Sequence, residues 1–211
     1  MKYALIGNGV WSAKIKSALA AMGREVFQIP IKTRMNYGEN KIAYENRLID
    51  TISCTESNII WICIPPSLES ELAIKAALSC GKNVICEKPW LSSKALTLKL
   101  SSLAEKQNLH VAVNYQYCFH DELSKLSAEV ANFDCYWEGN FSIDRPNRLG
   151  IDAEHNLASH LFAIAKLYFP TVQLKRLVTG YGVANKRSIN LFYSDTAKCF
   201  GNVDLLFNRQ P

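Results

Sequence analysis

The 211-residue sequence lacks several features that would assign it to a class at once. It contains no apolar run long enough to cross a lipid bilayer, and Met1-Lys2 leads into the first predicted strand without a signal segment. It also contains no block of lysine and arginine, so its net charge of +5 is weak support for a nucleic-acid partner. We therefore expect a cytoplasmic protein whose partner is neither a membrane nor a nucleic acid.

Metal-binding and disulfide patterns are missing as well. Seven cysteines are present, but none forms a CxxC pair or has the spacing of metal ligands. An odd number of cysteines, some of them within apolar segments, indicates free thiols in a reducing compartment and no bound metal. The remaining composition is that of a globular protein, with 48% apolar and 20% charged residues.

A glycine turn between a strand and a helix is the strongest functional pattern. The apolar run Tyr3–Ile6 breaks at Gly7, and helical spacing begins at about Ser12 and continues to Met22. Gly7 permits a tight turn, Gly9 lets backbone N–H groups approach a phosphate, and the helix N-terminus attracts an anion. The pattern predicts a dinucleotide site in which Ser12 replaces the third glycine of the GxGxxG fingerprint; the alternative is an ordinary strand-to-helix turn. The predicted cofactor-binding residues are Gly7, Asn8, Gly9, Val10, Trp11 and Ser12.

The tip of the second predicted strand, 25–29, bears on the choice of cofactor. In dinucleotide folds an acid at this tip binds the adenine ribose, whereas a basic residue accepts a 2′-phosphate. The tip contains no acid and continues into Lys32, Thr33 and Arg34. These three residues are predicted to contact the cofactor and favour NADP over NAD; the alternative is a solvated basic loop that touches nothing.

Strands and helices alternate through residues 1–115. Further strands are predicted at 58–64, 83–86 and 110–114, and helices at 43–51, 68–80 and from Ser92 or Ser93 onward. Strict alternation predicts an α/β fold, an N-terminal Rossmann domain with a doubly wound parallel sheet and a ligand site at the carboxyl ends of its strands.

The rhythm changes in residues 116–211. Helices are predicted at 121–131 and 157–168, the second ended by Pro170, with a loop at 145–150 between them. Strands are predicted at 133–141, 174–178, 188–193 and 199–206. This half is predicted to be a shortened α+β domain with a mainly antiparallel sheet.

Four short motifs carry a family resemblance: Gly7-Asn8-Gly9, Ile64-Pro65-Pro66-Ser67, Glu87-Lys88-Pro89 and Asn114-Tyr115-Gln116-Tyr117. In order and spacing they resemble the Gfo/Idh/MocA family of sugar oxidoreductases. The resemblance implies a nicotinamide dinucleotide and hydride transfer to or from a sugar-like or other small polar carbonyl or alcohol. It also implies that the C-terminal sheet roofs the active site and forms a homo-oligomer contact. The motif residues implied to bind cofactor are Pro65, Pro66, Glu87 and Lys88.

Hydride transfer needs a proton-transfer group beside the substrate oxygen. Lys88 follows a central strand and is held by Pro89, so we expect it to point toward the nicotinamide, with a pKa lowered toward neutrality by partial burial. Lys88 is therefore the predicted catalytic lysine, and Glu87 contacts the cofactor or orients Lys88. The alternative is a structural ion pair between Glu87 and Lys88.

The resemblance also implies an Asp and a His four residues apart in the second domain. Counted back from Pro170, His160 takes the histidine position and is the second predicted catalytic residue, with His155 as a competitor. Asn156 takes the aspartate position and, with Tyr117, is predicted to bind substrate. The alternative for His160 is a histidine that only packs beside an apolar stripe.

Three departures from the family pattern keep a second hypothesis open. Asn156 cannot carry a negative charge, Cys118 stands where the family has arginine, and Glu69 stands where a histidine is often found. The chain also stops at Pro211, earlier than family members usually do, which suggests a shortened, truncated or degenerate relative. The alternative function is therefore a non-catalytic dinucleotide-binding or regulatory protein; reduction of an imine or tetrapyrrole is a third hypothesis.

Overall fold

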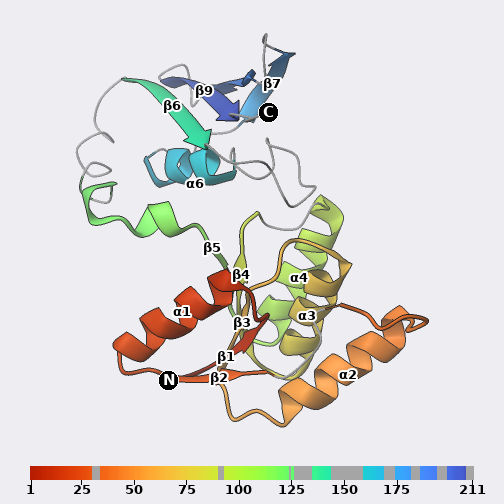
Figure 1. Cartoon of the computed structure of the whole chain (residues 1–211). Coiled ribbons are helices and arrows are strands. Elements are labelled where there is room, and N and C mark those ends of the chain that lie inside the picture. The colour runs from red at the N-terminus through yellow and green to blue at the C-terminus, as the bar shows by residue number, and fades with distance from the viewer. Residues whose placement is uncertain are drawn as a thin grey trace. The chain divides into compact units, whose positions relative to one another are not determined.

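The computed structural model describes residues 1–29, 34–89, 93–123, 125, 135–143, 159–168, 174–181, 186–193 and 199–207 (Figure 1). The chain divides into two compact units, Met1–Asn114 and Tyr115–Pro211. The domain boundary proposed from the sequence, after residue 115, lies one residue further along the chain.

A five-stranded parallel sheet forms the centre of the first unit, with strand order β2-β1-β3-β4-β5. This order reverses direction at β1, so the predicted α/β class and doubly wound Rossmann sheet are confirmed. The strands are β1 (Lys2–Ile6), β2 (Glu25–Gln28), β3 (Ile59–Ile62), β4 (Asn83–Glu87) and β5 (Val111–Asn114).

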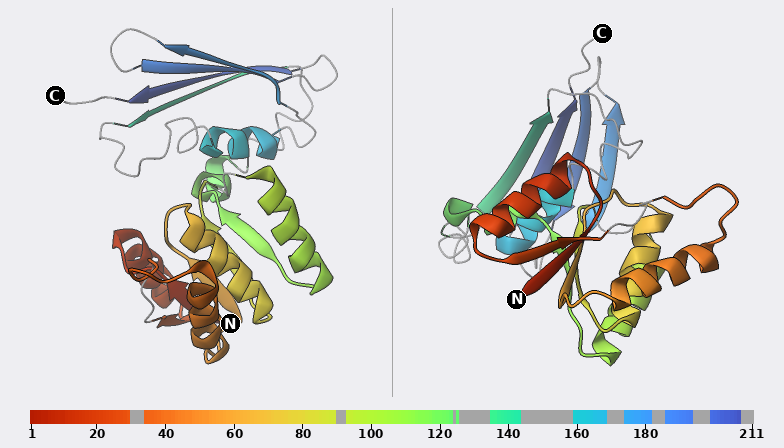
Figure 2. Two further views of the ribbon diagram at one scale, coloured as in Figure 1. Left: turned by 90° about the vertical axis from the view of Figure 1, so that its right-hand side faces the viewer. Right: turned by 60° about the horizontal axis from the view of Figure 1, so that its bottom comes forward.

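Helices lie on both faces of this sheet, with α1 on one side and α2, α3 and α4 on the other (Figures 1 and 2). Side chains alternate between the faces: Ile60 and Ile62 join the large apolar cluster beneath α2–α4, whereas Leu5 packs with Ile15 and Leu19 of α1. The near-continuous apolar runs of β1 and β3 therefore reflect burial on both sides. The helices are α1 (Val10–Ala21), α2 (Lys41–Ser53), α3 (Leu68–Ser79) and α4 (Lys94–Lys106).

The element boundaries correct the sequence prediction in detail. Helix α1 begins at Val10, before the predicted start at Ser12, because Gly9 serves as its N-cap. Strand β3 ends at Ile62, two residues before the predicted end, although Cys63 N–H still donates to Ile6 O at 2.8 Å. Helix α2 extends beyond the predicted 43–51 at both ends, and Asn40, as its N-cap, accounts for the earlier start.

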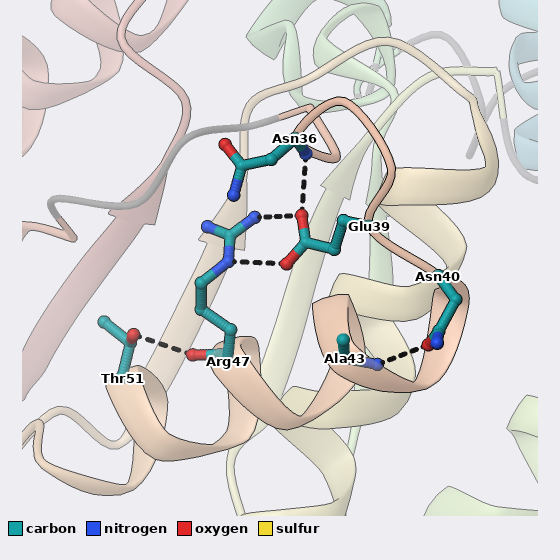
Figure 3. Close-up of polar contacts among 6 residues, drawn as sticks. All are labelled: Asn36, Glu39, Asn40, Ala43, Arg47 and Thr51. Atoms are coloured by element: carbon teal, nitrogen blue, oxygen red, sulfur yellow. Dashed lines mark hydrogen bonds and ion pairs between the residues drawn. The ribbon is translucent and has the colours of Figure 1, made fainter.

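An acidic side chain ties the segment before α2 to the helix itself (Figure 3). The Glu39 carboxylate accepts two hydrogen bonds from Arg47, at 2.9 and 3.0 Å, and one from the backbone N–H of Asn36 at 2.7 Å. The Asn40 side chain then accepts from Ala43 N–H at 2.9 Å. These contacts fix the path by which residues 36–40 enter α2.

The second unit begins with the short 3₁₀ helix η1 (Gln116–Phe119), and Asp121–Leu123 start the predicted helix 121–131. Apart from Lys125, which is also helical, the rest of that helix and the predicted loop 145–150 lie outside the described residues. Helix α6 (Ser159–Tyr168) falls within the predicted 157–168.

Four strands of the second unit lie side by side in the order β6-β9-β8-β7 (Figure 2). Strand β8 pairs antiparallel with β7 and with β9, whereas β6 pairs parallel with β9. No helix within the described part of the chain is both long and apolar enough to span a bilayer. The strands are β6 (Cys135–Ile143), β7 (Leu174–Tyr181), β8 (Lys186–Tyr193) and β9 (Cys199–Phe207).

Candidate functional site

The strand register brings the motifs of the first unit to one edge of its sheet. Ile6 pairs with Ile62, Ile62 pairs with Cys86, and Glu87 pairs with Asn114. The turn after β1 and the Glu87-Lys88-Pro89 motif after β4 therefore end up at the same, carboxyl edge, with β3 between them. This edge of a doubly wound sheet is where ligands bind.

Gly7 is required by both its backbone conformation and its surroundings. Its φ of +116° is one that side-chain-bearing residues rarely adopt, and a Cβ there would lie 3.1 Å from Cys63 O and 3.1 Å from Ile64 Cγ2. The turn after β1 therefore packs directly against the end of β3, as the tight-turn interpretation of Gly7 expects.

Gly9 serves a different purpose. Its φ of −77° suits any residue, and no heavy atom lies within 4 Å of the position a Cβ would take, so the space beside it is open. As the N-cap of α1 it supplies no side-chain oxygen, whereas Asn40, Ser67 and Ser93 cap α2, α3 and α4. The first turn of α1 carries no acid, so its N–H groups suit an anion. The neighbours Asn8, Val10 and Trp11 are exposed.

Beneath the turn lie two polar side chains, Ser12 and Gln28. Ser12 is buried, with 1% of its surface exposed, so the small residue in place of the third glycine is closely packed. Gln28 Nε2 donates to Gly7 O at 2.8 Å and to Leu5 O at 3.0 Å, and Ser12 Oγ lies 3.5 Å from Gln28 Oε1. Gln28 is not among the site residues predicted from the sequence, although a polar residue that ends a strand beside a glycine turn was an available signal.

Glu87 is held by two neutral donors from neighbouring strands. Its Oε1 accepts from Trp61 Nε1 at 3.0 Å and from Asn114 Nδ2 at 3.0 Å. Neither Trp61 nor Asn114 was predicted as a site residue, because only the sheet register shows that both contact Glu87. Lys88 follows directly, is half-buried, and is joined to the buried Pro89 by a cis peptide bond.

The second proline of the Pro65-Pro66 pair meets the Glu87-Lys88-Pro89 motif. Pro66, Glu87 and Pro89 line one small, mainly apolar pocket with Ile62, Ile64, Ser70, Ile74 and Cys86. Pro65 is exposed. Residues of the proline pair and of the Glu87-Lys88-Pro89 motif, about twenty residues apart in the sequence, thus line the same pocket at the carboxyl ends of β3 and β4.

Two cysteine thiols near this edge of the sheet, those of Cys63 and Cys86, are unreactive. Burial raises the pKa of Cys63 to about 12, with a further rise from the charge of Glu87 and an opposing effect of a hydrogen bond from Ser12. Burial also raises the pKa of Cys86. Both thiols are therefore neutral at physiological pH and are not nucleophiles.

In the second unit, the structure brings His160 together with the residues of the fourth motif. His160 lies in the first turn of α6 and is buried, with 4% of its surface exposed. The ring of Tyr117 meets it edge-on at 4.9 Å between centroids and 75° between planes, and the ring of Tyr115 at 6.3 Å and 79°. A predicted catalytic residue and a predicted substrate-binding residue are thus neighbours.

The structure leaves most of the remaining site predictions untested. Lys32, Thr33 and Asn156, with the competing His155, lie outside the described residues. Arg34 is described and exposed.

Known proteins resemble this chain in sequence and in fold. An uncharacterized oxidoreductase of Schizosaccharomyces pombe is 27% identical; the alignment covers 75% of this chain and 53% of that protein, so the chain spans about half of its relative's length. An inositol dehydrogenase homolog from Azotobacter vinelandii, solved with NADH and myo-inositol, shares the fold at a TM-score of 0.76 and 15% identity, covering 97% of this chain and 63% of that one.

A second solved neighbour is the WlbA dehydrogenase from Thermus thermophilus, in complex with NAD and UDP-GlcNAcA. It has a TM-score of 0.73 and 18% identity, covering 98% of this chain and 74% of that one. The family model described as "oxidoreductase family, NAD-binding Rossmann fold" matches residues 3–115, more than half of the chain. The chain therefore belongs to the Gfo/Idh/MocA family of oxidoreductases.

Proposed function

We propose that the protein binds a nicotinamide dinucleotide and transfers a hydride to or from a small polar carbonyl or alcohol, of which sugars are the leading class. The observation that carries the proposal is the uncapped N-terminus of α1, with open space beside Gly9, at the same sheet edge as Lys88. The end of β1 and the end of β4 are two strand spacings apart, about 10 Å. One nucleotide half of a dinucleotide spans such a gap.

In this proposal, different residues bind the cofactor and transfer the proton. Gly7, Gly9 and the first turn of α1 hold the pyrophosphate, and the dinucleotide supplies the hydride when bound. Lys88 donates or accepts the proton at the substrate oxygen, with His160 as the second proton-transfer group and Tyr117 at the substrate.

The cofactor preference we propose is NADP, on the strength of the basic tip that contains Lys32 and Arg34. Fluorescence titrations with NADH and NADPH test both the site and the preference: a dissociation constant near 1 μM, about −8 kcal/mol, is expected for one of them. Replacing Arg34 by Ala should weaken the binding of NADPH more than the binding of NADH. Failure of the protein to bind either dinucleotide would remove the proposal.

Lys88→Ala tests the catalytic assignment, with Lys82→Ala as its matched control. The two lysines flank β4 at opposite ends, and Lys82 donates instead to Thr55 O at 3.0 Å. Lys88→Ala should abolish turnover while dinucleotide binding persists, and Lys82→Ala should keep turnover. Full activity of Lys88→Ala would exclude this lysine from the mechanism.

One observation favours a second candidate, a dinucleotide-binding protein without turnover. At the position of the family's arginine stands Cys118, whose thiol cannot carry a positive charge, and burial raises its pKa so that it stays neutral. A panel of keto-sugars, polyols and imines assayed with both cofactors decides between the candidates, because measurable oxidation or reduction of the cofactor excludes the second.

Two coarser properties belong to the same proposal. The described cysteines, Cys54, Cys63, Cys80, Cys86 and Cys118, are free thiols, which suits a reducing cytoplasm. The sheet of the second unit has β6 and β7 at its edges, and pairing with a second copy would cover such an edge. Light scattering of the purified protein should then show a homo-oligomer rather than a monomer.

A further inference from the structure

The side chain of Gln28 contacts the glycine turn from below, and the function proposed above gives it no role. The residue ends β2 and is exposed, yet both hydrogens of its amide are directed at main-chain carbonyls, Leu5 O at 3.0 Å and Gly7 O at 2.8 Å. Ser12 Oγ, 3.5 Å from Gln28 Oε1, links the same amide to the first turn of α1. One side chain thus connects β1, the turn and α1.

The bond to Gly7 O differs in kind from the bond to Leu5 O. Leu5 O already accepts from Ile29 N–H at 3.0 Å, within the pairing of β1 with β2, so the strands are joined there without the side chain. Gly7 lies beyond the last residue of β1, where the ladder between the strands has ended. The Gln28 amide therefore fixes the orientation of the Gly7 carbonyl where no strand partner does so.

The orientation of this carbonyl determines what the turn presents to a ligand. In a trans peptide the C=O of one residue and the N–H of the next point in opposite directions. With Gly7 O held toward Gln28, the N–H of the exposed residue Asn8 points away from Gln28. If this peptide turned over, a carbonyl oxygen would face an incoming phosphate and repel it.

We infer that Gln28 is a positioning residue for the anion-binding turn, which keeps the Gly7–Asn8 peptide oriented with its N–H toward the dinucleotide pyrophosphate. The inference rests on the proposed function and adds a residue to it that touches neither the phosphates nor the reacting atoms. A side chain from β2 thereby determines that the glycine turn presents an N–H group, and not a carbonyl oxygen, to its ligand.

Gln28→Met tests the inference, because methionine keeps the length of the side chain and removes its donors. Loss of one hydrogen bond that holds the peptide should weaken NADH and ADP-ribose binding roughly three- to tenfold. Gln28→Glu should weaken binding of both ligands further, since an ionised carboxylate cannot donate a hydrogen bond and adds negative charge beneath the turn. The matched control is Thr55→Val, which removes the 2.8 Å bond from Thr55 Oγ1 to Ile52 O at the far edge of the same unit.

Two measurements on the full chain separate the outcomes. The first is isothermal titration with NADH and ADP-ribose at matched fractions of folded protein; the second is the backbone chemical shifts of Gly7 C′ and Asn8 N without ligand. We expect Gln28→Met to lose affinity and to change these shifts, and Thr55→Val to do neither. Wild-type affinity or unchanged shifts in Gln28→Met would overturn the inference. If the wild-type protein binds no dinucleotide, the proposed function fails, and the ligand-free shifts still decide whether Gln28 orients the peptide.

Discussion

Substitution by alanine should affect different properties at the two glycines of the turn, stability at Gly7 and dinucleotide binding at Gly9. Gly7→Ala places a methyl group against the backbone of β3, whereas Gly9→Ala places it in open space beside the N-terminus of α1. We expect Gly7→Ala to lower the free energy of unfolding. Gly9→Ala should change stability by no more than about 1 kcal/mol, because alanine is a poorer N-cap than glycine but restricts the unfolded chain. It should weaken dinucleotide binding, because its methyl group occupies the space through which the pyrophosphate approaches.

The cost at Gly7 has two parts. A positive φ costs a residue with a Cβ roughly 1–2 kcal/mol. The two contacts at 3.1 Å, one of them to the main-chain oxygen of Cys63, require the end of β3 to move, and overpacking of this kind costs about 1–3 kcal/mol. The sum, about 2–5 kcal/mol, is a large share of the 5–15 kcal/mol typical of a folded domain.

Gly81→Ala separates the two parts, because Gly81 has a φ of +68° and open space around its Cβ position. It should show only the conformational cost, roughly 1–2 kcal/mol. Urea unfolding followed by circular dichroism measures stability, and NADH fluorescence measures binding. Equal stability of Gly7→Ala and the wild type would refute the close approach of the turn to β3. Undiminished NADH affinity of Gly9→Ala would refute the placement of the pyrophosphate.

Three further predictions follow from contacts in the first unit. Trp61→Phe keeps a ring but removes the donor to Glu87 Oε1, so we expect urea unfolding to show a loss of about 1–2 kcal/mol; an unchanged midpoint would contradict the bond. Because the pKa of Cys63 is raised to about 12, its thiol stays protonated at pH 8.5, and mass spectrometry should find the exposed Cys54 alkylated by iodoacetamide well before Cys63; equal rates would contradict the burial. Glu39→Gln, at a carboxylate whose side chain is 10% exposed, should cost about 1–3 kcal/mol in the same urea assay, and a wild-type midpoint would show that the ion pair contributes nothing.

The first unit was predictable because its pattern is local. An apolar run that ends in Gly7-Asn8-Gly9 specifies a strand, a turn and a helix within twenty residues, and the alternation of such segments specifies a parallel sheet. The family motifs added the position of Lys88. Boundaries were less accurate because caps decide them: Gly9 and Asn40 start their helices where apolar spacing alone does not show it.

The supporting polar contacts were not predictable from the sequence because they join distant strands. Trp61 reads as one more apolar residue in its strand, and its indole N–H meets Glu87 only after β3 pairs with β4. Gln28 likewise acts across the pairing of β1 with β2. Hydrophobic periodicity and short motifs predict which residues share a face of a helix or strand. They do not predict which atoms of separate strands come within 3 Å of each other.

In the function we propose, the sheet edge separates two electrostatic tasks. At the end of β1 the binding groups are main-chain N–H dipoles of the turn and of α1, which attract an anion without introducing a titratable charge. At the end of β4, about 10 Å away by strand spacing, stand the charged neighbours Glu87 and Lys88. A bare carboxylate there would repel a bound diphosphate, but Trp61 and Asn114 each place an N–H on its Oε1 and disperse that charge. Anion binding and proton transfer can therefore be altered independently: substitutions at the turn should change cofactor affinity, and substitutions around Glu87 should change turnover.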